Sequence, residues 1–342
     1  MIILRIILLP ISLIYSFCIF LRNRCYDLHL LPSKSPDAFT VAIGNLTVGG
    51  TGKTPFTAHV LEKVFREKVA FLSRGYGRKT KGLIKVDSKS TALEIGDEPL
   101  LIHRRFSSVP AVVSENRMAG VEAIMNMAPQ TEAIILDDAY QHRQLHADVY
   151  ILLCDYNRPI WNDCMLPSGR LRDNRIEKRR AAAIIISKCP SNISQPEMDL
   201  ISKKMKLRSR QRIFFTSVDY GNPCPANELA KSFVLDEKTP VVGLAGIAQP
   251  QLFSDFLKSN FNQSIFLRFP DHHSFSKDEV DQVLQQCSSL GAIVMTEKDA
   301  MRWSDNSTAA FYIPISVRFI KGEEQFSELL RKAQLEKMKS RY

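Results

Sequence analysis

Short apolar runs follow one another through the first two hundred residues, each separated from the next by a polar or helix-like stretch. The runs lie at residues 38–46, 69–75, 109–114, 132–138, 148–155 and 181–188. After the first run, residues 54–68 carry apolar side chains at helical spacing. Buried strands that alternate with helices are typical of a parallel sheet covered on both faces. The pattern therefore predicts an α/β fold, with a mostly parallel sheet and flanking helices.

A second group of apolar segments predicts a smaller C-terminal α/β lobe. These segments lie at residues 239–250, 264–275 and 291–300. Residues 212–218 and 310–319 are alike in their β-branched and aromatic content, and we expect them to pair as a two-stranded connection between the lobes. The predicted parts are an N-terminal membrane-associated helix at residues 1–30, a nucleotide-binding domain at 31–215, the smaller lobe at 216–320 and a C-terminal helix at 321–342.

The chain begins with a membrane-affine segment, because residues 2–21 are almost entirely apolar. Its polar exceptions are Arg5, Ser12 and Ser16, and Arg22 and Arg24 follow it. The length is about the 20 residues that cross a bilayer. However, Arg5 and Pro10 weaken a straight span, since an arginine at mid-bilayer costs about 2.5–3.5 kcal/mol. We favour a helix that lies in the membrane interface; a single span and a buried helix of the soluble domain are the alternatives.

The flanks of this segment predict its orientation. A signal peptide needs a positively charged start and a small-residue cleavage site, and neither is evident. Arg22 and Arg24 follow the preference of basic residues for the cytoplasmic side. The domain that follows is therefore expected in the cytosol.

A glycine-rich turn joins the first predicted strand to the first predicted helix. Within IGNLTVGGTGKTPF, residues 43–56, Gly52, Lys53 and Thr54 match the end of the Walker A pattern GxxxxGK[ST]. In that pattern the backbone N–H groups and the lysine hold phosphate, while the hydroxyl reaches Mg²⁺. The residues of this phosphate loop that we expect to bind the cofactor are Thr47, Val48, Gly49, Gly50, Thr51, Gly52, Lys53 and Thr54.

The loop departs from the standard pattern in two places. Thr47 replaces the first glycine, so Gly49 and Gly50 are expected to supply the backbone freedom instead. Val48 stands where the glycine-doubled variant of the loop carries an extra lysine. Pro55 suits the start of a helix, where its missing N–H would be unpaired in any case.

A pair of acids at the end of an apolar run predicts the metal side of the site. Asp137 and Asp138 follow the apolar residues AIIL, and a carboxylate at a strand end is what reaches Mg²⁺ opposite a phosphate loop. With Thr54 they form the predicted Mg²⁺ ligands. The base-reading segment of guanine-specific proteins is absent from residues 184–190, where Pro190 replaces the needed aspartate, so ATP is preferred over GTP.

Charge and cysteine content narrow the class of partner. The formal net charge of +10 favours polyanions, including nucleotides, nucleic acid and anionic lipid surfaces. No aromatic stacking or groove-reading motif supports nucleic acid, so none is expected. The seven cysteines form no CxxC pair and are odd in number, which indicates neither a zinc site nor a disulfide framework and fits a reducing cytosol.

Eight motifs occur together in the order found in one family. They are GNLTVGGTGKTP (44–55), SRGYGRK (73–79), GDEP (96–99), DDAYQH (137–142), LPSGRLRD (166–173), SKCP (187–190), FPDHHSF (269–275) and TEKDA (296–300). Over roughly residues 40–320 the chain resembles the tetraacyldisaccharide 4'-kinases, membrane-associated P-loop kinases of lipid A biosynthesis. The combination is specific, although each motif alone is not.

The resemblance implies an activity and a location. The expected reaction moves the γ-phosphate of ATP to the 4'-hydroxyl of tetraacyldisaccharide 1-phosphate, giving lipid IVA. The expected place is the cytoplasmic face of the bacterial inner membrane, where the apolar N-terminus would bring the phosphate loop to an acylated disaccharide. No obligate protein partner is evident.

The resemblance also implies roles for individual residues. Lys53 and Thr54 hold phosphate and Mg²⁺, Asp137 and Asp138 are the metal-side acids, and Asp97 is the general base. His272 is the partner of Asp97 from the second lobe. The expected substrate contacts are Arg74, Tyr76, Glu98, His142 and Asp173, with Arg74 suited to bidentate phosphate contact. Two positions depart from the family pattern: Ala139 stands in place of glycine, and Asp173 in place of glutamate.

One alternative class stays open at this point. Glycine-doubled phosphate loops also serve nucleotide-driven switches and partner-activating ATPases. A switch needs neither access to lipid nor a base for an alcohol, whereas the apolar N-terminus, Asp97 and His272 suit a kinase. A transfer assay with labelled ATP separates the two classes.

Overall fold

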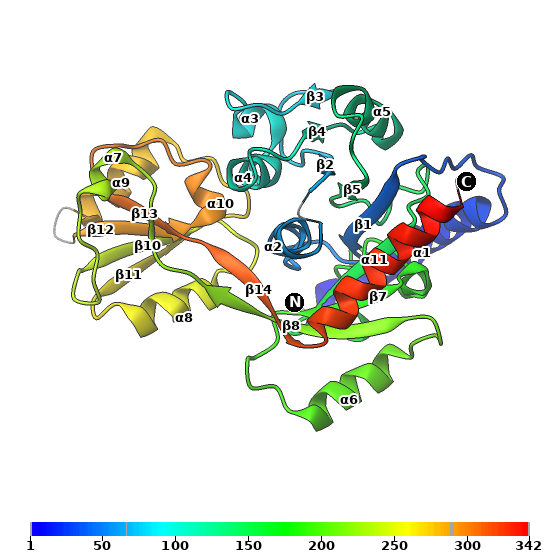
Figure 1. Cartoon of the computed structure of the whole chain (residues 1–342). Helices are drawn as coiled ribbons and strands as arrows, with labels where there is room; N and C mark the ends of the chain where they lie inside the picture. The colour runs from blue at the N-terminus through cyan, green and yellow to red at the C-terminus, as the bar shows by residue number, and fades with distance from the viewer. Residues whose placement is uncertain (1, 66, 288–290, 341–342) are drawn as a thin grey trace.

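The computed structural model describes residues 2–65, 67–287 and 291–340, which form two lobes, each built on its own sheet (Figure 1). Within these residues the large lobe holds a nine-stranded sheet in the order β14-β8-β7-β6-β1-β5-β2-β4-β3. Its strands are β1 Phe39–Asn45, β2 Val69–Ser73, β3 Ile84–Lys85, β4 Ala111–Val113, β5 Ala133–Leu136, β6 Val149–Asp155, β7 Ala183–Ser187, β8 Arg212–Tyr220 and β14 Ile315–Lys321.

Pairing in this sheet is parallel from β4 through to β8, and only the edge strands β3 and β14 pair antiparallel. The predicted mostly parallel sheet is therefore confirmed. The central strands β1, β2, β5, β6 and β7 are buried along their whole length. Burial on both faces explains why their sequences are apolar runs rather than alternating patterns.

Helices cover both faces of the large sheet. They are α2 Lys53–His59, which continues as the π-helical turn Val60–Val64, then α3 Ala92–Ile95, α4 Asp97–Arg105, α5 Arg117–Met127, α6 Gln195–Met205 and α11 Glu323–Lys339, with 3₁₀ turns at Ile160–Asn162 and Arg175–Arg180. Val41 of β1 packs in one core with Phe56 of α2 and Phe326 of α11. The next residue, Ala42, points into the other core with Ile124 of α5.

Within the described residues, the small lobe holds a five-stranded sheet in the order β11-β10-β12-β13-β9. Its strands are β9 Cys224–Pro225, β10 Val241–Ala245, β11 Ser264–Arg268, β12 Ala292–Thr296 and β13 Ala310–Ile313, and its helices are α7 Glu228–Lys231, α8 Gln251–Asn260, α9 Lys277–Cys287 and α10 Glu297–Ala300. The strands β11, β10, β12 and β13 pair parallel. The predicted smaller α/β lobe is confirmed.

Two strands connect the lobes. β8 and β14 pair antiparallel, with Val218 opposite Val317. Residues 310–319, expected as one strand, are divided at Pro314 into β13 of the small sheet and β14 of the large sheet. Proline has no N–H to donate to a strand ladder, so the break falls where the chain passes from one sheet to the other. Figure 1 shows this connection running below α2 between the two lobes.

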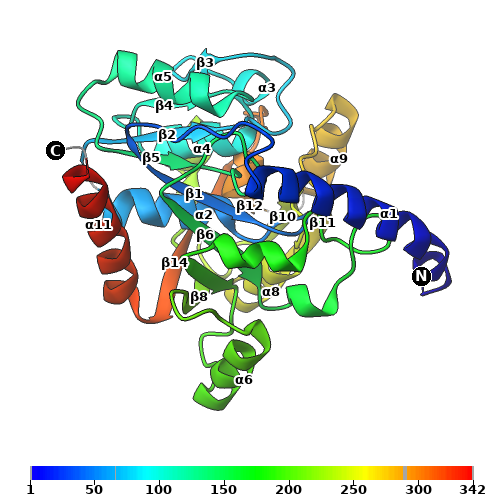
Figure 2. The ribbon, with the colours of Figure 1, turned by 90° about the vertical axis from the view of Figure 1, so that its right-hand side faces the viewer.

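The N-terminal helix α1, Ile2–Asp27, lies along the large lobe, and its N-terminal end extends beyond the body of the protein (Figure 2). From Arg5 to Asp27 it is long and apolar enough to cross a membrane by length and composition. Its exposed apolar side chains include Ile6, Ile7, Leu9, Ile11, Leu13, Ile14, Phe17, Phe20 and Leu21. Ser12 and Asn23, in contrast, are buried against the lobe. The helix thus has one docked polar face and one uncovered apolar face.

Candidate active site

A cavity of about 430 Å³ lies between the lobes and is lined on one side by the phosphate loop. All eight loop residues from Thr47 to Thr54 line it, as predicted for a common site. Tyr76, Glu98 and Asp138 join them from the large lobe, and His272 and Lys298 from the small lobe. The topology explains this meeting, because the carboxyl ends of β1 and β5 lie at one edge of the parallel sheet, where ligand sites form.

The phosphate loop is held by hydrogen bonds to its own strand, β1, and to β7, which lies on the far side of β6. Asn45 at the end of β1 donates to Oγ1 of Thr51 at 2.8 Å, and Ser187 at the end of β7 donates to the Thr51 carbonyl at 2.8 Å. Gly49 and Gly52 have φ of 95° and 83°, a region that glycine adopts without strain. The prediction that Gly49 supplies backbone freedom is correct. The other glycine with a positive φ in this loop is Gly52, not Gly50 as predicted.

Lys53 and Asp138 face each other at the cavity. The Lys53 ammonium lies 3.6 Å from Asp138 Oδ1, and Arg172 donates to both carboxylate oxygens of Asp138. Burial opposes the charge of Asp138, but Lys53 and Arg172 outweigh burial and hold its pKa well below the usual range. Asp138 also has φ of 47°, in the left-handed region, whereas the next residue, Ala139, is not among the residues with positive φ. Ala139 needs no positive φ, so alanine is tolerated there.

Asp137 is the deeper member of the acid pair. It is buried, and Thr57 donates to its Oδ1 at 3.3 Å. Burial, together with the neighbouring Glu98 and Asp138 charges, raises its pKa to about 7 although Lys53 acts against that change. Asp138, but not Asp137, is among the residues that line the cavity.

Asp97 and His272 meet across the two lobes. Asp97 is the first residue of α4 and is 4% exposed, and its Oδ1 lies 3.2 Å from Nδ1 of His272. Burial opposes the charge of Asp97, but the His272 hydrogen bond and the Lys298 and Arg302 charges lower its pKa to about 2. The second oxygen, Oδ2, is buried and has no hydrogen-bond partner among the described residues. Oδ2 lies in ion-pair contact instead, 3.2 Å from Nδ1 of His272 and 3.8 Å from the Arg302 guanidinium.

Lys298 completes this contact between the lobes. Its ammonium lies 3.1 Å from Glu98 Oε1, 3.1 Å from His272 Nε2 and 3.6 Å from Asp97 Oδ2. An ammonium only donates, so Nε2 of His272 accepts and Nδ1 carries the proton toward Asp97. Burial lowers the pKa of Lys298, but the Glu98 and Asp97 carboxylates outweigh it and raise the pKa above the usual value.

The remaining predicted substrate residues lie in different surroundings. Tyr76 is 62% exposed, lines the cavity and sets its ring edge against His272 at 5.2 Å between centroids. Arg74 is exposed and His142 is half-buried, and neither lines the cavity. Burial, followed by the Arg117 and Arg74 charges, lowers the pKa of His142 to about 4. His142 is therefore neutral at neutral pH.

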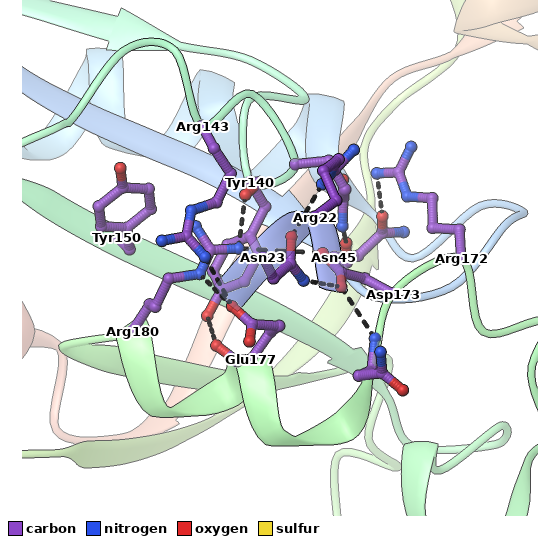
Figure 3. Close-up of polar contacts among 12 residues, drawn as sticks. Arg22, Asn23, Asn45, Tyr140, Arg143, Tyr150, Arg172, Asp173, Glu177 and Arg180 are labelled. Atoms are coloured by element: carbon purple, nitrogen blue, oxygen red, sulfur yellow. Dashed lines mark hydrogen bonds and ion pairs between the residues drawn. The ribbon is translucent and has the colours of Figure 1, made fainter. Parts of the chain in front are cut away.

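Asp173 lies in a buried network under α1 and does not line the cavity (Figure 3). Its side chain is fully buried, and Asn23 of α1 donates to its Oδ1 at 2.8 Å. Arg180 lies 4.0 Å from Oδ2 and donates to Glu177 at 2.9 Å. This position does not support the contact with substrate that the family resemblance implied for Asp173. The side chain instead holds the N-terminal helix against the lobe.

Three cationic side chains that line the cavity were not assigned a role in the sequence analysis. Arg172 pairs with Asp138, Lys298 with Glu98, and Lys188 with Asp155. Each lies in a segment that the motif comparison selected, namely LPSGRLRD, TEKDA and SKCP. Spacing within those segments does not show which lysine or arginine turns toward the cavity, because their partners come from distant parts of the chain.

Comparison with known proteins gives consistent matches along the whole chain. A family model described as tetraacyldisaccharide-1-P 4'-kinase matches residues 4–335. A protein named tetraacyldisaccharide 4'-kinase from Flavobacterium johnsoniae is 36% identical, over 94% of this chain and 95% of that protein. Another of the same name, from Bacteroides thetaiotaomicron, is 39% identical, over 86% of this chain and 82% of that protein.

Solved structures include a similar molecule. The crystal structure of LpxK from Aquifex aeolicus, described as an "apo" form in complex with ATP, is 28% identical to this chain. Its TM-score is 0.75, and the match covers 96% of this chain and 99% of that one.

Proposed function

The chain belongs to the tetraacyldisaccharide-1-phosphate 4'-kinase family, and on this premise we propose that the cavity between its lobes is the active site. The protein is a kinase of lipid A biosynthesis that uses ATP to phosphorylate the 4'-hydroxyl of tetraacyldisaccharide 1-phosphate. The observation that carries the placement is the contact of Asp97 with His272, which lines the same cavity as the phosphate loop.

The triphosphate of ATP is proposed to lie along residues 47–54. The loop offers backbone N–H groups and the Lys53 ammonium, the two features that hold β- and γ-phosphates in such loops. The apolar part of the cavity lining includes Val218, Tyr220, Leu252, Phe253, Ile313 and Ile315. A planar, weakly polar base suits that part, so we place the adenine there.

Mg²⁺ is proposed to bind between Thr54 and the acid pair. Within the described residues, no group of three or more His, Cys, Asp and Glu side chains could hold a metal by itself. This fits Mg²⁺, which commonly takes one or two carboxylates and completes its shell with substrate phosphates and water. The residues present are a hydroxyl, Thr54, and two carboxylates, Asp137 and Asp138. When bound, the ion would neutralise charge on the transferring phosphate.

Asp97 is proposed to accept the proton of the 4'-hydroxyl. With a pKa of about 2 it is ionised at neutral pH and is a weak base. A weak base suffices, because phosphoryl transfer passes through a loose transition state and depends mainly on positioning and charge. Oδ2 makes no hydrogen bond among the described residues, so we place the substrate hydroxyl at this oxygen. Since Lys298 and Arg302 cover Oδ2, the sugar enters while the lobes are apart.

The membrane is proposed to lie against the uncovered face of α1. The opposite face of α1 is hydrogen-bonded to the lobe along most of the helix. Ser168 donates to the Arg5 carbonyl near one end, and Arg143 donates to Asp27 at the other end. A helix docked in this way has no free segment to cross a bilayer, so we favour the interfacial arrangement over a span. The helix would then hold the cavity near acyl chains at the cytoplasmic face of the inner membrane.

The role of Asp97 is tested by Asp97→Asn with labelled ATP and detergent-dispersed lipid substrate. The amide keeps the shape but cannot take a proton, so the turnover number should fall by about 10²–10⁴-fold, while ATP affinity stays close to that of the unchanged enzyme. Lys53→Ala is the comparison and should lose ATP binding as well. Equal loss of ATP affinity in both variants would remove Asp97 from the proton-transfer step.

The same assay tests the alternative class. A kinase moves label from ATP to the lipid, whereas a nucleotide-driven switch releases label only as inorganic phosphate. Label found solely in phosphate, with the lipid present, would contradict the active site proposed for this cavity.

A further inference from the structure

The carbonyl side of the phosphate loop is held by the end of β7. Lys188 donates to the Gly50 carbonyl, and the preceding Ser187 donates to the Thr51 carbonyl at 2.8 Å. In a trans peptide the C=O and the following N–H point in opposite directions. Holding these two carbonyls therefore turns the N–H groups of Thr51 and Gly52 away from β7. These N–H groups are then free to bind phosphate.

Lys188 does not make this contact alone. It adopts φ of 60°, an uncommon backbone conformation for lysine, and its ammonium also lies 3.0 Å from Asp155 Oδ2 at the end of β6. The Lys188 side chain is 11% exposed and that of Asp155 is 2% exposed. A nearly buried ion pair loses its hydration, so it depends on further hydrogen bonds for its geometry.

Those further bonds come from the small lobe. Gln249, in the loop between β10 and α8, accepts from Lys188 at 3.0 Å through Oε1 and donates to Asp155 at 2.6 Å through Nε2. Its neighbour Ala248 also lies against the loop, since a Cβ added to Gly50 would stand 3.4 Å from the Ala248 Cβ. Both polar ends of one neutral side chain therefore serve the pair that orients the Gly50–Thr51 peptide.

We propose that Gln249 is a positioning residue for ATP, which completes the Lys188–Asp155 pair when the small lobe closes and so fixes the Gly50–Thr51 peptide for phosphate binding. This inference rests on the proposed binding of the ATP phosphates at residues 47–54. Because lobe closure and phosphate binding share these contacts, each favours the other, as linkage requires. The contact is separate from Asp97 and His272, which meet in another part of the interface between the lobes.

The test compares Gln249→Ala with Gln251→Ala in steady-state kinetics of the full-length enzyme. Gln251 is the same residue type two positions along, is exposed, and donates to Asp255 within its own lobe. Gln249→Ala should raise the KM for ATP by about tenfold, the size expected for one hydrogen bond to a charged group. The KM for the lipid and the turnover number should stay close to those of Gln251→Ala.

Two results would overturn the proposal. One is an unchanged KM for ATP in Gln249→Ala, and the other is an equal rise in both KM values, which would indicate a general defect of the interface. A double-mutant cycle combines Lys188→Met with Gln249→Ala. If the two side chains act as one unit, the KM for ATP of the double variant should be close to that of the worse single variant. Additive effects on this KM would count against the proposal. Lys178→Met is the control for the loss of a lysine side chain. Lys178 donates to the Met205 carbonyl, away from the phosphate loop.

Lys53→Ala separates this inference from the proposed function. ATP binding at full strength in Lys53→Ala would overturn the placement of ATP at the loop. Loss of binding in that variant together with normal kinetics in Gln249→Ala would overturn only the role of Gln249.

Discussion

Carboxylates only a few positions apart differ in acidity in this chain, because each faces a different set of charges. Asp138 meets Lys53 and Arg172 and is held ionised, whereas the adjacent Asp137 is buried near Glu98 and has a pKa raised to about 7. Asp97 faces three cationic or proton-donating side chains and has a pKa near 2. The residue type alone does not set these values; the partners supplied by other strands and by the second lobe do.

Lys298→Met should change the pH dependence of the reaction. Removing this cation raises the pKa of Asp97 from about 2 toward the ordinary value of 3.8, so Asp97 becomes protonated at a higher pH. Only the ionised carboxylate accepts a proton, so the acid-side fall of kcat/KM should move to higher pH. Profiles that extend down to about pH 3 and up to about pH 8 check this. Lys277→Met, an exposed lysine of the same lobe, should leave the profile in place.

Identical acid limbs in the Lys298→Met enzyme and the unchanged enzyme would show that Lys298 does not act on Asp97. A uniform fall of activity at every pH would point instead to loss of the contact between the lobes. The two outcomes are distinct, because only a changed pKa moves a limb along the pH axis.

Asp173→Ala tests whether this residue fastens α1 or contacts substrate. The change leaves the buried Asn23 amide without its acceptor, which should lower the free energy of unfolding by about 1–3 kcal/mol and expose the α1 junction to proteases. Asp199→Ala, which removes an exposed acid of α6 that accepts a hydrogen bond from Gln195, is the control. Unchanged protease resistance with a raised KM for the lipid would support the substrate role suggested by the family resemblance.

At the scale of elements, α1 has two faces with different tasks. Ser12, Ser16 and Asn23 face the lobe and make hydrogen bonds there, whereas Ile14 and Phe17 are about two-thirds exposed. Burying that apolar face in a lipid interface removes it from water, which is the driving force for a peripheral helix. Polar contacts therefore fix the helix to the enzyme and leave its apolar side for lipid.

Ile14→Glu should weaken binding to vesicles without unfolding the protein. The side chain is 66% exposed, so a charge there costs little in water but is unfavourable in the acyl region. Sedimentation with phosphatidylethanolamine–phosphatidylglycerol vesicles measures the change. Leu335→Glu, at a 57% exposed leucine of α11, is the matched control. Equal vesicle binding by both variants would mean that the membrane meets the protein elsewhere.

The elements of this fold could largely be predicted because their signals are local. The buried strands β1, β2, β5, β6 and β7 are continuous apolar runs, and the phosphate loop lies where strand, glycines and helix coincide. The division at Pro314 was missed because the aromatic and β-branched content on both sides of it reads as one strand. The limits proposed for the four parts of the chain stay predictions.

The site was predicted less completely, for a physical reason. Asp97 and His272 could be paired only through the family resemblance, since they are far apart in the sequence and meet when two lobes close. Lys188 lies in the SKCP motif, but its role could not be predicted there, and Gln249 lies in no motif. Both roles depend on Asp155 and the Gly50 carbonyl, which come from distant parts of the chain. Asp173 carried an expectation of substrate contact that its burial under α1 does not support.

At the scale of the whole molecule, the lobes are joined in three ways. The strands β8 and β14 form the covalent connection. Lys298 and His272 of the small lobe contact Glu98 and Asp97, and Gln249 bonds the Lys188–Asp155 pair at the phosphate loop. Only the first is permanent. The other two form between side chains of different lobes, so they are made on closure and broken when the substrate enters or the product leaves.

Combining Lys298→Met with Gln249→Ala should therefore open the molecule more than either change alone. With both contacts removed, β8, β14 and the Asp97–His272 contact still join the lobes, but the closed arrangement loses two of the contacts that offset its loss of conformational entropy. Small-angle X-ray scattering should show the largest radius of gyration for the double variant, with circular dichroism unchanged. Saturating ATP should restore the compact form in the unchanged enzyme but not in the double variant. A double variant as compact as the unchanged enzyme would mean that the strand connection alone sets the closed state, and closure would then not be controlled from the phosphate loop.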